Sequence, residues 1–197
     1  MKNLKKTSFI LSILSLLTFF TSANAEIKVV ASIKPIHSLA SYLMDGVNKP
    51  DLIVDGYASP HGFALKPSHA KMLQNADLIF WVGEDLENFL EKPLNSIAKK
   101  AEKIELIEIK GLKKLKFRER NIFDEHDDHG HEGHAHGEYD PHIWLDPQNA
   151  KIILNEMAEH LIENDQKNTS VYKANLNKAK NDNIDKINDV FFRFFIV

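Results

Sequence analysis

The chain of 197 residues contains no cysteine, and this absence excludes several classes of protein. Without thiols the chain cannot have the disulfide framework that stabilises many small secreted domains. It cannot be a cysteine-anchored lipoprotein, and it cannot bind a metal through thiolates as zinc fingers do. Any metal site must therefore use histidine, aspartate, glutamate or water.

The chain also lacks a strong excess of either charge. It has 25 Lys and Arg against 28 Asp and Glu, a formal net charge of −3. A mildly acidic chain is not typical of proteins that bind nucleic acid or anionic membranes. The sequence has no GxGxxG or Walker motif, which excludes the common nucleotide sites. Its N-terminal apolar run is about twelve residues, shorter than the roughly 20 that a membrane-spanning helix needs.

Residues 1–25 have the composition of a secretory signal peptide. A lysine-rich start is followed by the apolar run at 9–20, and the small residues Ala23 and Ala25 stand where signal peptidase inspects the chain. Cleavage after Ala25 would remove three lysines and no acidic residue, which changes the formal net charge from −3 to −6. We therefore expect a soluble periplasmic protein without stable membrane insertion.

Residues 26–109 alternate between short apolar segments and amphipathic ones. The pattern predicts strands at 26–33, 51–56, 77–83 and 103–109, and helices at 35–47, 66–76 and 86–101, the last interrupted near Pro93. Short, continuously apolar strands are typical of a parallel sheet that is covered on both faces. We predict an α/β fold, a Rossmann-like lobe with a four-stranded parallel sheet whose outer strand is 103–109.

Two further helices are predicted, at 147–164 and 167–189. The second has only a thin apolar stripe, which is typical of a connector between domains. We therefore expect an N-terminal lobe over 26–164 and a connecting helix over 165–190. The apolar tail 191–197 is unlike the polar end of most chains, so we expect that it docks in a groove or that the chain is shortened.

Residues 112–140 form a predicted flexible, charged loop. Its second part, "DEHDDHGHEGHAHGEYD" (124–140), holds five histidines: His126, His129, His131, His134 and His136. Three glycines disfavour regular structure there, and the histidines have no fixed ligand spacing. The composition indicates a collector of metal with weak and redundant sites. An acidic insert without a role is the alternative.

His61 has better defined surroundings, because Pro60 and Gly62 flank it just after the predicted strand 51–56. The carboxyl ends of parallel strands are where open α/β sheets bind ligands. This position makes His61 a candidate metal ligand. Taken alone, it is equally well interpreted as an exposed loop histidine.

His142 is the second candidate ligand, since Pro141 restricts the backbone before it. Asp146 lies four residues further on. Its carboxylate could orient an imidazole, but capping the helix at 147–164 is the favoured interpretation.

The remaining histidines are interpreted as lying outside the site. We expect His69 to be a surface residue of a helix and His160 to be solvated on an acidic helix face. We expect His37 to be a bystander near the end of the first strand.

Three segments together carry a resemblance to a known family: "VVASIKPIHSLA", "SPHGFALKPSHAKMLQNADLIFWVGEDLENFL" and "DPHIWLDPQNA". They resemble the metal-binding receptors of bacterial ABC transporters, and more closely the periplasmic receptors of high-affinity zinc importers (metal-binding solute-binding protein family 9). The resemblance covers nearly all of 26–189. It implies two α/β lobes joined by a long helix, with His61 and His142 binding metal in the cleft between the lobes.

The same resemblance implies a monomeric receptor that carries Zn²⁺ to an ABC permease in the inner membrane and catalyses no reaction. The His-rich loop would gather zinc or regulate uptake. Zinc is favoured over manganese because the sequence has no obvious all-oxygen cluster.

The sequence departs from the family pattern in two ways. Pro60 stands where some zinc receptors have an acidic residue. The family's third histidine and last acidic ligand belong to a second lobe, which we expect this chain to lack, so we expect weaker zinc binding than in a complete receptor.

Three other interpretations stay open on the residues alone. One is a metal-buffering fragment that uses 124–140 without docking to a permease. Another is a metallohydrolase built on His61 and His142, which is disfavoured because no general-base motif adjoins them. The third is a non-functional product of a truncated gene.

Overall fold

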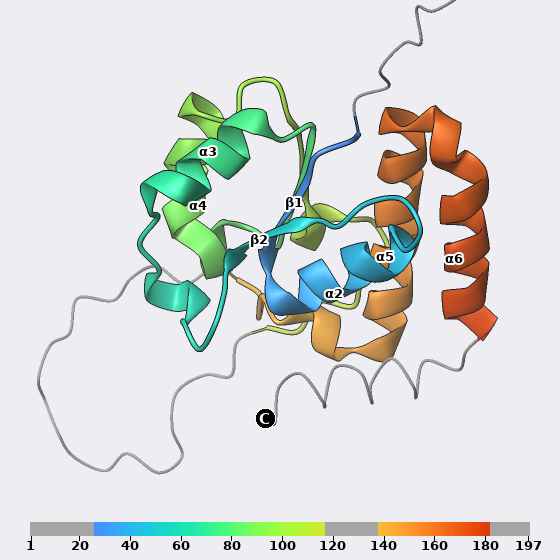
Figure 1. Cartoon of the computed structure of the whole chain (residues 1–197). Helices are drawn as coiled ribbons and strands as arrows, with labels where there is room; N and C mark the ends of the chain where they lie inside the picture. Colours follow the sequence, from blue (N-terminus) through green and yellow to red (C-terminus); the bar gives the residue numbers. More distant parts are fainter. Residues whose placement is uncertain (1–25, 117–137, 182–197) are drawn as a thin grey trace, which may run out of the picture.

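The computed structural model describes residues 26–116 and 138–181 (Figure 1). Four strands form one sheet: β1 (Val29–Ile33), β2 (Asp51–Val54), β3 (Leu78–Trp81) and β4 (Glu102–Glu105). Their order is β2-β1-β3-β4 and every pair is parallel. The predicted α/β fold and the outer position of the fourth strand are therefore confirmed. The predicted signal peptide and the tail 191–197 lie outside the described residues.

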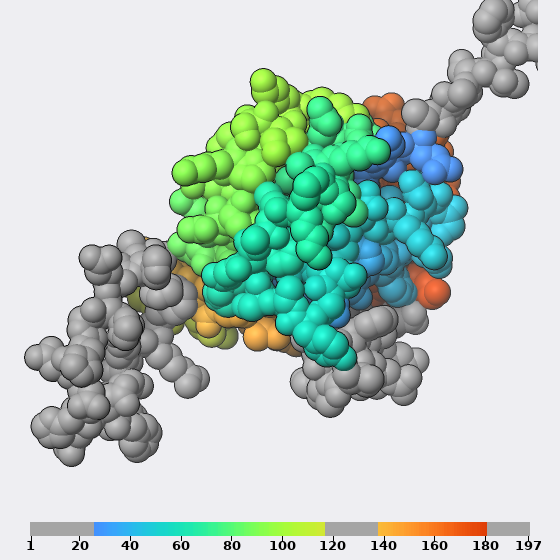
Figure 2. Space-filling model, turned by 60° about the vertical axis from the view of Figure 1, so that its left-hand side comes forward, coloured from blue at the N-terminus to red at the C-terminus, as the bar shows by residue number. Residues whose placement is uncertain are grey.

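Helices cover both faces of the sheet (Figure 1). One side has α2 (Lys34–Leu43), α5 (Pro147–Asn164) and α6 (Thr169–Asn181), and the other has α3 (Pro67–Asn75) and α4 (Glu84–Ser96). Segments that include α3 and α4, coloured from teal to green, form one continuous face in Figure 2. All five residues of β1 are buried as a result, which explains why it is almost continuously apolar. None of the helices in the described ranges is long and apolar enough to cross a membrane.

The predicted interruption of α4 lies at a different residue from the one expected. The helix continues past Pro93 to Ser96, and the Ile97 N–H bonds the Pro93 carbonyl at 2.8 Å. The non-helical residue is Glu87 (φ −124°, ψ 47°). Its carboxylate accepts hydrogen bonds from the Val82 and Gly83 N–H groups just after β3, so the break coincides with a local polar contact.

Strand β4 is shorter than the predicted 103–109. It ends at Glu105 because its partner β3 ends at Trp81, the residue paired with Glu105. The chain then turns into a 3₁₀ helix, Leu106–Glu108. The alternating apolar pattern of 103–109 therefore extends past Glu105, although β3 offers no further residues with which β4 could pair.

The first part of the predicted connecting helix is fixed to the lobe. A 3₁₀ turn (Gln166–Asn168) precedes α6, which packs against α2 and α5. Tyr172 of its thin apolar stripe is fully buried, and its hydroxyl donates to Asp165 Oδ2 at 2.7 Å. Asn175 Nδ2 donates to the Leu43 carbonyl at 2.8 Å. The thin apolar stripe of the predicted connector is therefore covered by α2 and α5 over this first part.

Candidate metal centre

A hollow of about 360 Å³ lies beside the carboxyl ends of β1 and β2. Its lining includes Ile33 and Val54, the last residues of those strands, together with His61 and His142. This edge is where open parallel sheets bind ligands. The fold thus brings the two predicted histidines together from distant parts of the chain.

The two imidazoles have a separation that suits a shared metal ion. Their ring centroids lie 5.8 Å apart, with a 44° angle between the ring planes. Two imidazoles on one tetrahedral zinc ion, with Zn–N near 2.0–2.1 Å, place their centroids about 5 Å apart. A shift of under about 1 Å would therefore let both rings bind one ion, although their role as ligands stays a prediction.

His61 is held by a short turn after β2. It is the middle residue of a 3₁₀ helix, Pro60–Gly62, and its backbone N–H donates to Ser59 Oγ at 3.3 Å. The side chain itself is exposed. The turn fixes the backbone and leaves the imidazole open to an incoming ion.

His142 is oriented by Asp140. One oxygen, Asp140 Oδ1, lies 3.0 Å from the His142 backbone nitrogen and 2.6 Å from ring Nδ1. The Trp144 ring also contacts the imidazole, with centroids 5.2 Å apart. A carboxylate at Nδ1 favours the proton on that nitrogen and leaves Nε2 as the metal-binding atom.

Asp140 contacts the candidate ligand His142, and the sequence analysis did not name it among the candidate site residues. Asp146 caps α5 by accepting from Gln148 N–H at 2.8 Å, as the favoured interpretation predicts. Asp140 lies two residues before His142, so the spacing "DPH" was the available signal. The predicted loop 112–140 includes Asp140, which is why the sequence does not single out this residue.

The ends of the predicted loop 112–140 are ordered, which corrects that assignment. Lys116 and Tyr139 form an antiparallel bridge, and Asp140 N–H donates to the Leu115 carbonyl at 2.7 Å. Asn149 of α5 bonds both the N–H and the carbonyl of Lys113, at 2.8 and 3.0 Å. These contacts form a stem that positions Asp140. The five loop histidines, His126, His129, His131, His134 and His136, lie outside the described residues.

Replacing Asp140 with asparagine is expected to weaken zinc binding about 10–100-fold, because the carboxylate that orients His142 is lost. Competition with a chromogenic zinc chelator measures the change. Asp146→Asn is the matched control, since asparagine also caps helices and Asp146 bonds α5 rather than His142. Equal affinities for Asp140→Asn and the unaltered chain would refute the orienting role.

His69 is not a surface residue, contrary to expectation. It is only 9 % exposed and stacks on Phe63 with centroids 5.3 Å apart. Its Nδ1 accepts from the Lys66 N–H at 3.1 Å. Burial, and secondarily the charge of Lys66, lower the pKa of His69, so the ring is held neutral at the start of α3. It serves the structure of the helix.

Two other histidines were expected outside the site. His37 bonds the Pro50 carbonyl through Nε2 at 2.9 Å and does not line the hollow. His160 was expected to be solvated, but its side chain is only 19 % exposed and lies 2.8 Å from Glu102. The apolar periodicity of α5 does not predict that Glu102 of β4 lies beside His160.

Comparison with known families agrees with the metal-binding site that the geometry suggests. A family model described as ZnuA, zinc-uptake complex component A, periplasmic, matches residues 29–190. The chain belongs to the ZnuA family. Its curated relatives include the high-affinity zinc uptake system protein ZnuA of Brucella abortus (strain 2308), which is 39% identical over an alignment of 185 positions that covers 81% of this chain and 55% of the relative. The protein of the same name from Yersinia pestis is 34% identical over an alignment of 183 positions that covers 88% of this chain and 57% of the relative.

The chain thus spans about half the length of the curated ZnuA relatives it matches. Solved structures agree on the fold. The Mn-bound periplasmic metal binding protein from Candidatus Liberibacter asiaticus matches with a TM-score of 0.61 and 20% identity, over 77% of this chain and 51% of that one. The metal-dependent lipoprotein YcdH from Bacillus subtilis gives a TM-score of 0.63 and 20% identity, over 84% and 54%.

Proposed function

We propose that the chain is a monomeric periplasmic receptor that captures Zn²⁺ and delivers it to an ABC-type permease for import. The observation that carries this is the pair His61 and His142, whose rings face one hollow at the carboxyl edge of the sheet, 5.8 Å apart. The names of the ZnuA relatives support the same function. The predicted signal peptide supports the location.

The ligand chemistry favours capture of zinc over a permanent structural site. Zinc prefers four ligands, and a structural site has all four from the protein. His61 and His142 supply two, so water or groups outside the described ranges must complete the shell. Imidazole ligands suit zinc, whereas manganese prefers carboxylate and water.

The hollow is poorly equipped for hydrolysis. The described residues that line it beside His61 and His142 include Lys34, Tyr57 and Trp144 but no carboxylate. A metallohydrolase needs a base beside the metal-bound water. The lining therefore supports a receptor rather than an enzyme.

Exposed apolar side chains border the two hollows that His142 lines, and they support a partner surface there. Tyr57, which is 98 % exposed, borders the first hollow, and Leu115 and Leu145 border a second hollow of about 240 Å³ that also contains His142. Grouped exposed apolar residues often mark interaction sites. We propose that this face meets the partner to which zinc is delivered.

Deleting residues 124–137 separates the receptor from a metal buffer. This deletion removes all five loop histidines and keeps Asp140. A receptor keeps its tightest Zn²⁺ site after the deletion and loses it in His61→Ala/His142→Ala, as measured by calorimetric titration. A buffer gives the reverse result, with most of its capacity lost on deletion and little change in the double variant.

A further inference from the structure

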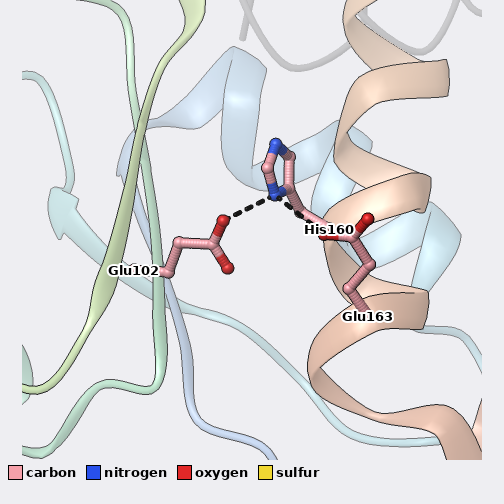
Figure 3. Close-up of side chains that lie close together, drawn as sticks. All are labelled: Glu102, His160 and Glu163. Atoms are coloured by element: carbon pink, nitrogen blue, oxygen red, sulfur yellow. Dashed lines mark ion pairs between the residues drawn. The ribbon is translucent and has the colours of Figure 1, made fainter.

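Three possible metal ligands, Glu102, His160 and Glu163, lie close together away from the candidate metal centre, and Figure 3 shows their side chains. Glu102 begins β4, and His160 and Glu163 belong to the last turns of α5. One ligand atom from each residue lies within 4.8 Å of the other two. The first turn of α5 follows His142, and a helix rises 1.5 Å per residue, so about 20 Å of helix separates this group from the candidate metal centre.

The spacing of the three groups suits a single ion. His160 Nδ1 lies 2.8 Å from Glu102 Oε1 and 3.9 Å from Glu163 Oε2. Neighbouring ligands on a tetrahedral zinc ion, with bonds near 2.0–2.1 Å, lie about 3.3 Å apart. The two observed distances bracket that value, so small side-chain movements would bring both oxygens into the shell.

The decisive observation is the state of His160 Nδ1. This atom is buried and makes no hydrogen bond with any described residue, although Glu102 Oε1 is only 2.8 Å away. The carboxylate oxygen must therefore lie off the axis along which an N–H would point. A metal ion placed along the direction of the Nδ1 lone pair could bind both Nδ1 and Glu102 Oε1. A proton on Nδ1 could not reach that oxygen in a hydrogen bond.

Two neighbours lie beside these ligands. Asn164 Nδ2 donates to Glu102 Oε2 at 2.6 Å and to the His160 carbonyl at 2.9 Å, so Glu102 presents its other oxygen, Oε1, to the imidazole. Glu156 Oε1 lies 3.6 Å from His160 Nε2, the ring nitrogen that would not bind metal. This separation is too long for a hydrogen bond, so Glu156 would have to move closer to orient the ring as carboxylates orient metal-binding histidines.

We propose that Glu102, His160 and Glu163 form a second binding site for a divalent transition-metal ion, with water completing the shell and Zn²⁺ as the probe. Imidazole nitrogens and carboxylate oxygens are both accepted donors to zinc. The simpler alternative is an ion pair of protonated His160 with its carboxylates. A protonated imidazole in this setting should donate from Nδ1, and the geometry shows no such bond. A bound ion would fasten the edge strand β4 to α5 and so stabilise the sheet edge.

Anomalous diffraction at the zinc edge, from crystals of the full chain in excess Zn²⁺, is expected to show an ion about 2.0–2.2 Å from His160 Nδ1 and from both carboxylates. In solution, ¹⁵N-histidine spectra should show the His160 ring signal shifting on addition of Zn²⁺. His160→Gln assigns that signal. Because the readout is His160 itself, it does not depend on the candidate metal centre or on the loop.

Glu163→Gln is expected to raise the Zn²⁺ concentration needed for that shift at least tenfold. Glu163 is an exposed side chain, so the variant should fold. Glu159→Gln makes the same change of charge at another exposed position of α5 outside the group and should leave the titration unchanged. The site is overturned if crystals with zinc at His61 and His142 show none here, or if the two glutamine variants titrate alike.

Discussion

Replacing His142 with alanine is expected to weaken Zn²⁺ binding at the His61–His142 site by more than 100-fold. The His142 side chain makes three contacts in the site. Its ring faces His61, contacts Trp144 and is held by the Asp140 carboxylate. Structural zinc sites with four ligands bind with about 10–16 kcal/mol, or roughly 3 kcal/mol for each ligand. A loss of that size corresponds to a factor above 100 in the dissociation constant.

The measurement should be made in the chain that lacks residues 124–137, so that the loop histidines do not bind the added metal. Titration against a chelator of known zinc affinity gives the dissociation constant. His37→Ala is the matched control, because His37 is also a partly buried histidine near the end of β1 but bonds Pro50 instead of facing the hollow. If His142→Ala and His37→Ala bind zinc equally well, His142 is not a ligand.

The sequence predicted the elements best where local chemistry sets their limits. Helix α5 has the predicted bounds 147–164, because Asp146 caps it and Pro147 favours its first turn. The length of β4 was overestimated, because a strand ends where its partner ends and that partner is distant in sequence. Local sequence signals thus predicted the ends of helix α5, whereas the length of strand β4 depended on its pairing with β3.

The candidate metal centre likewise depends partly on local signals and partly on the tertiary arrangement. His61 and His142 stood out because prolines and a strand end surround them. Their convergence on one hollow depends on the sheet order and the stem at Lys116 and Tyr139, which no local pattern contains. Asp140 was missed because its role depends on that stem.

The wrong assignments of His69 and His160 have a related cause. Both lie on helices whose polar sequences suggest solvent on that face. His69 turns inward to bond the Lys66 N–H, and His160 faces the edge strand through Glu102. Whether a helical histidine is exposed is therefore decided by its neighbours in space.

A second large effect is expected at Glu87, whose carboxyl group is buried between the end of β3 and α4. It is fully buried, and its Oε2 accepts from the Val82 and Gly83 N–H groups at 2.7 and 3.1 Å. Its Oε1 has no hydrogen-bond partner among the described residues. Burial raises the pKa of Glu87 from 4.5 to about 7, and the nearby charge of Glu105 adds a little to this effect. The Ser32 side chain and the Gly83 and Val82 N–H groups act in the opposite direction.

The direction of the pH effect follows from this shift. The folded chain binds the Glu87 proton more tightly than the unfolded chain, so this group favours folding below about pH 4.5. That advantage is lost as the pH rises to about 7. At pH 8 the ionised, buried carboxylate costs about 3 kcal/mol relative to acidic pH, at 1.36 kcal/mol for each unit of pKa.

Glu87→Gln is therefore expected to raise the free energy of unfolding at pH 8, while the gain at pH 5 is smaller by on the order of 2 kcal/mol. Glutamine keeps an oxygen that can accept from Val82 and Gly83 but carries no charge. Denaturant unfolding at both pH values measures the effect. Glu91→Gln, an exposed position of the same helix, controls for the general loss of one negative charge. If Glu87→Gln and Glu91→Gln change stability equally at both pH values, Glu87 does not titrate in the folded protein near neutral pH.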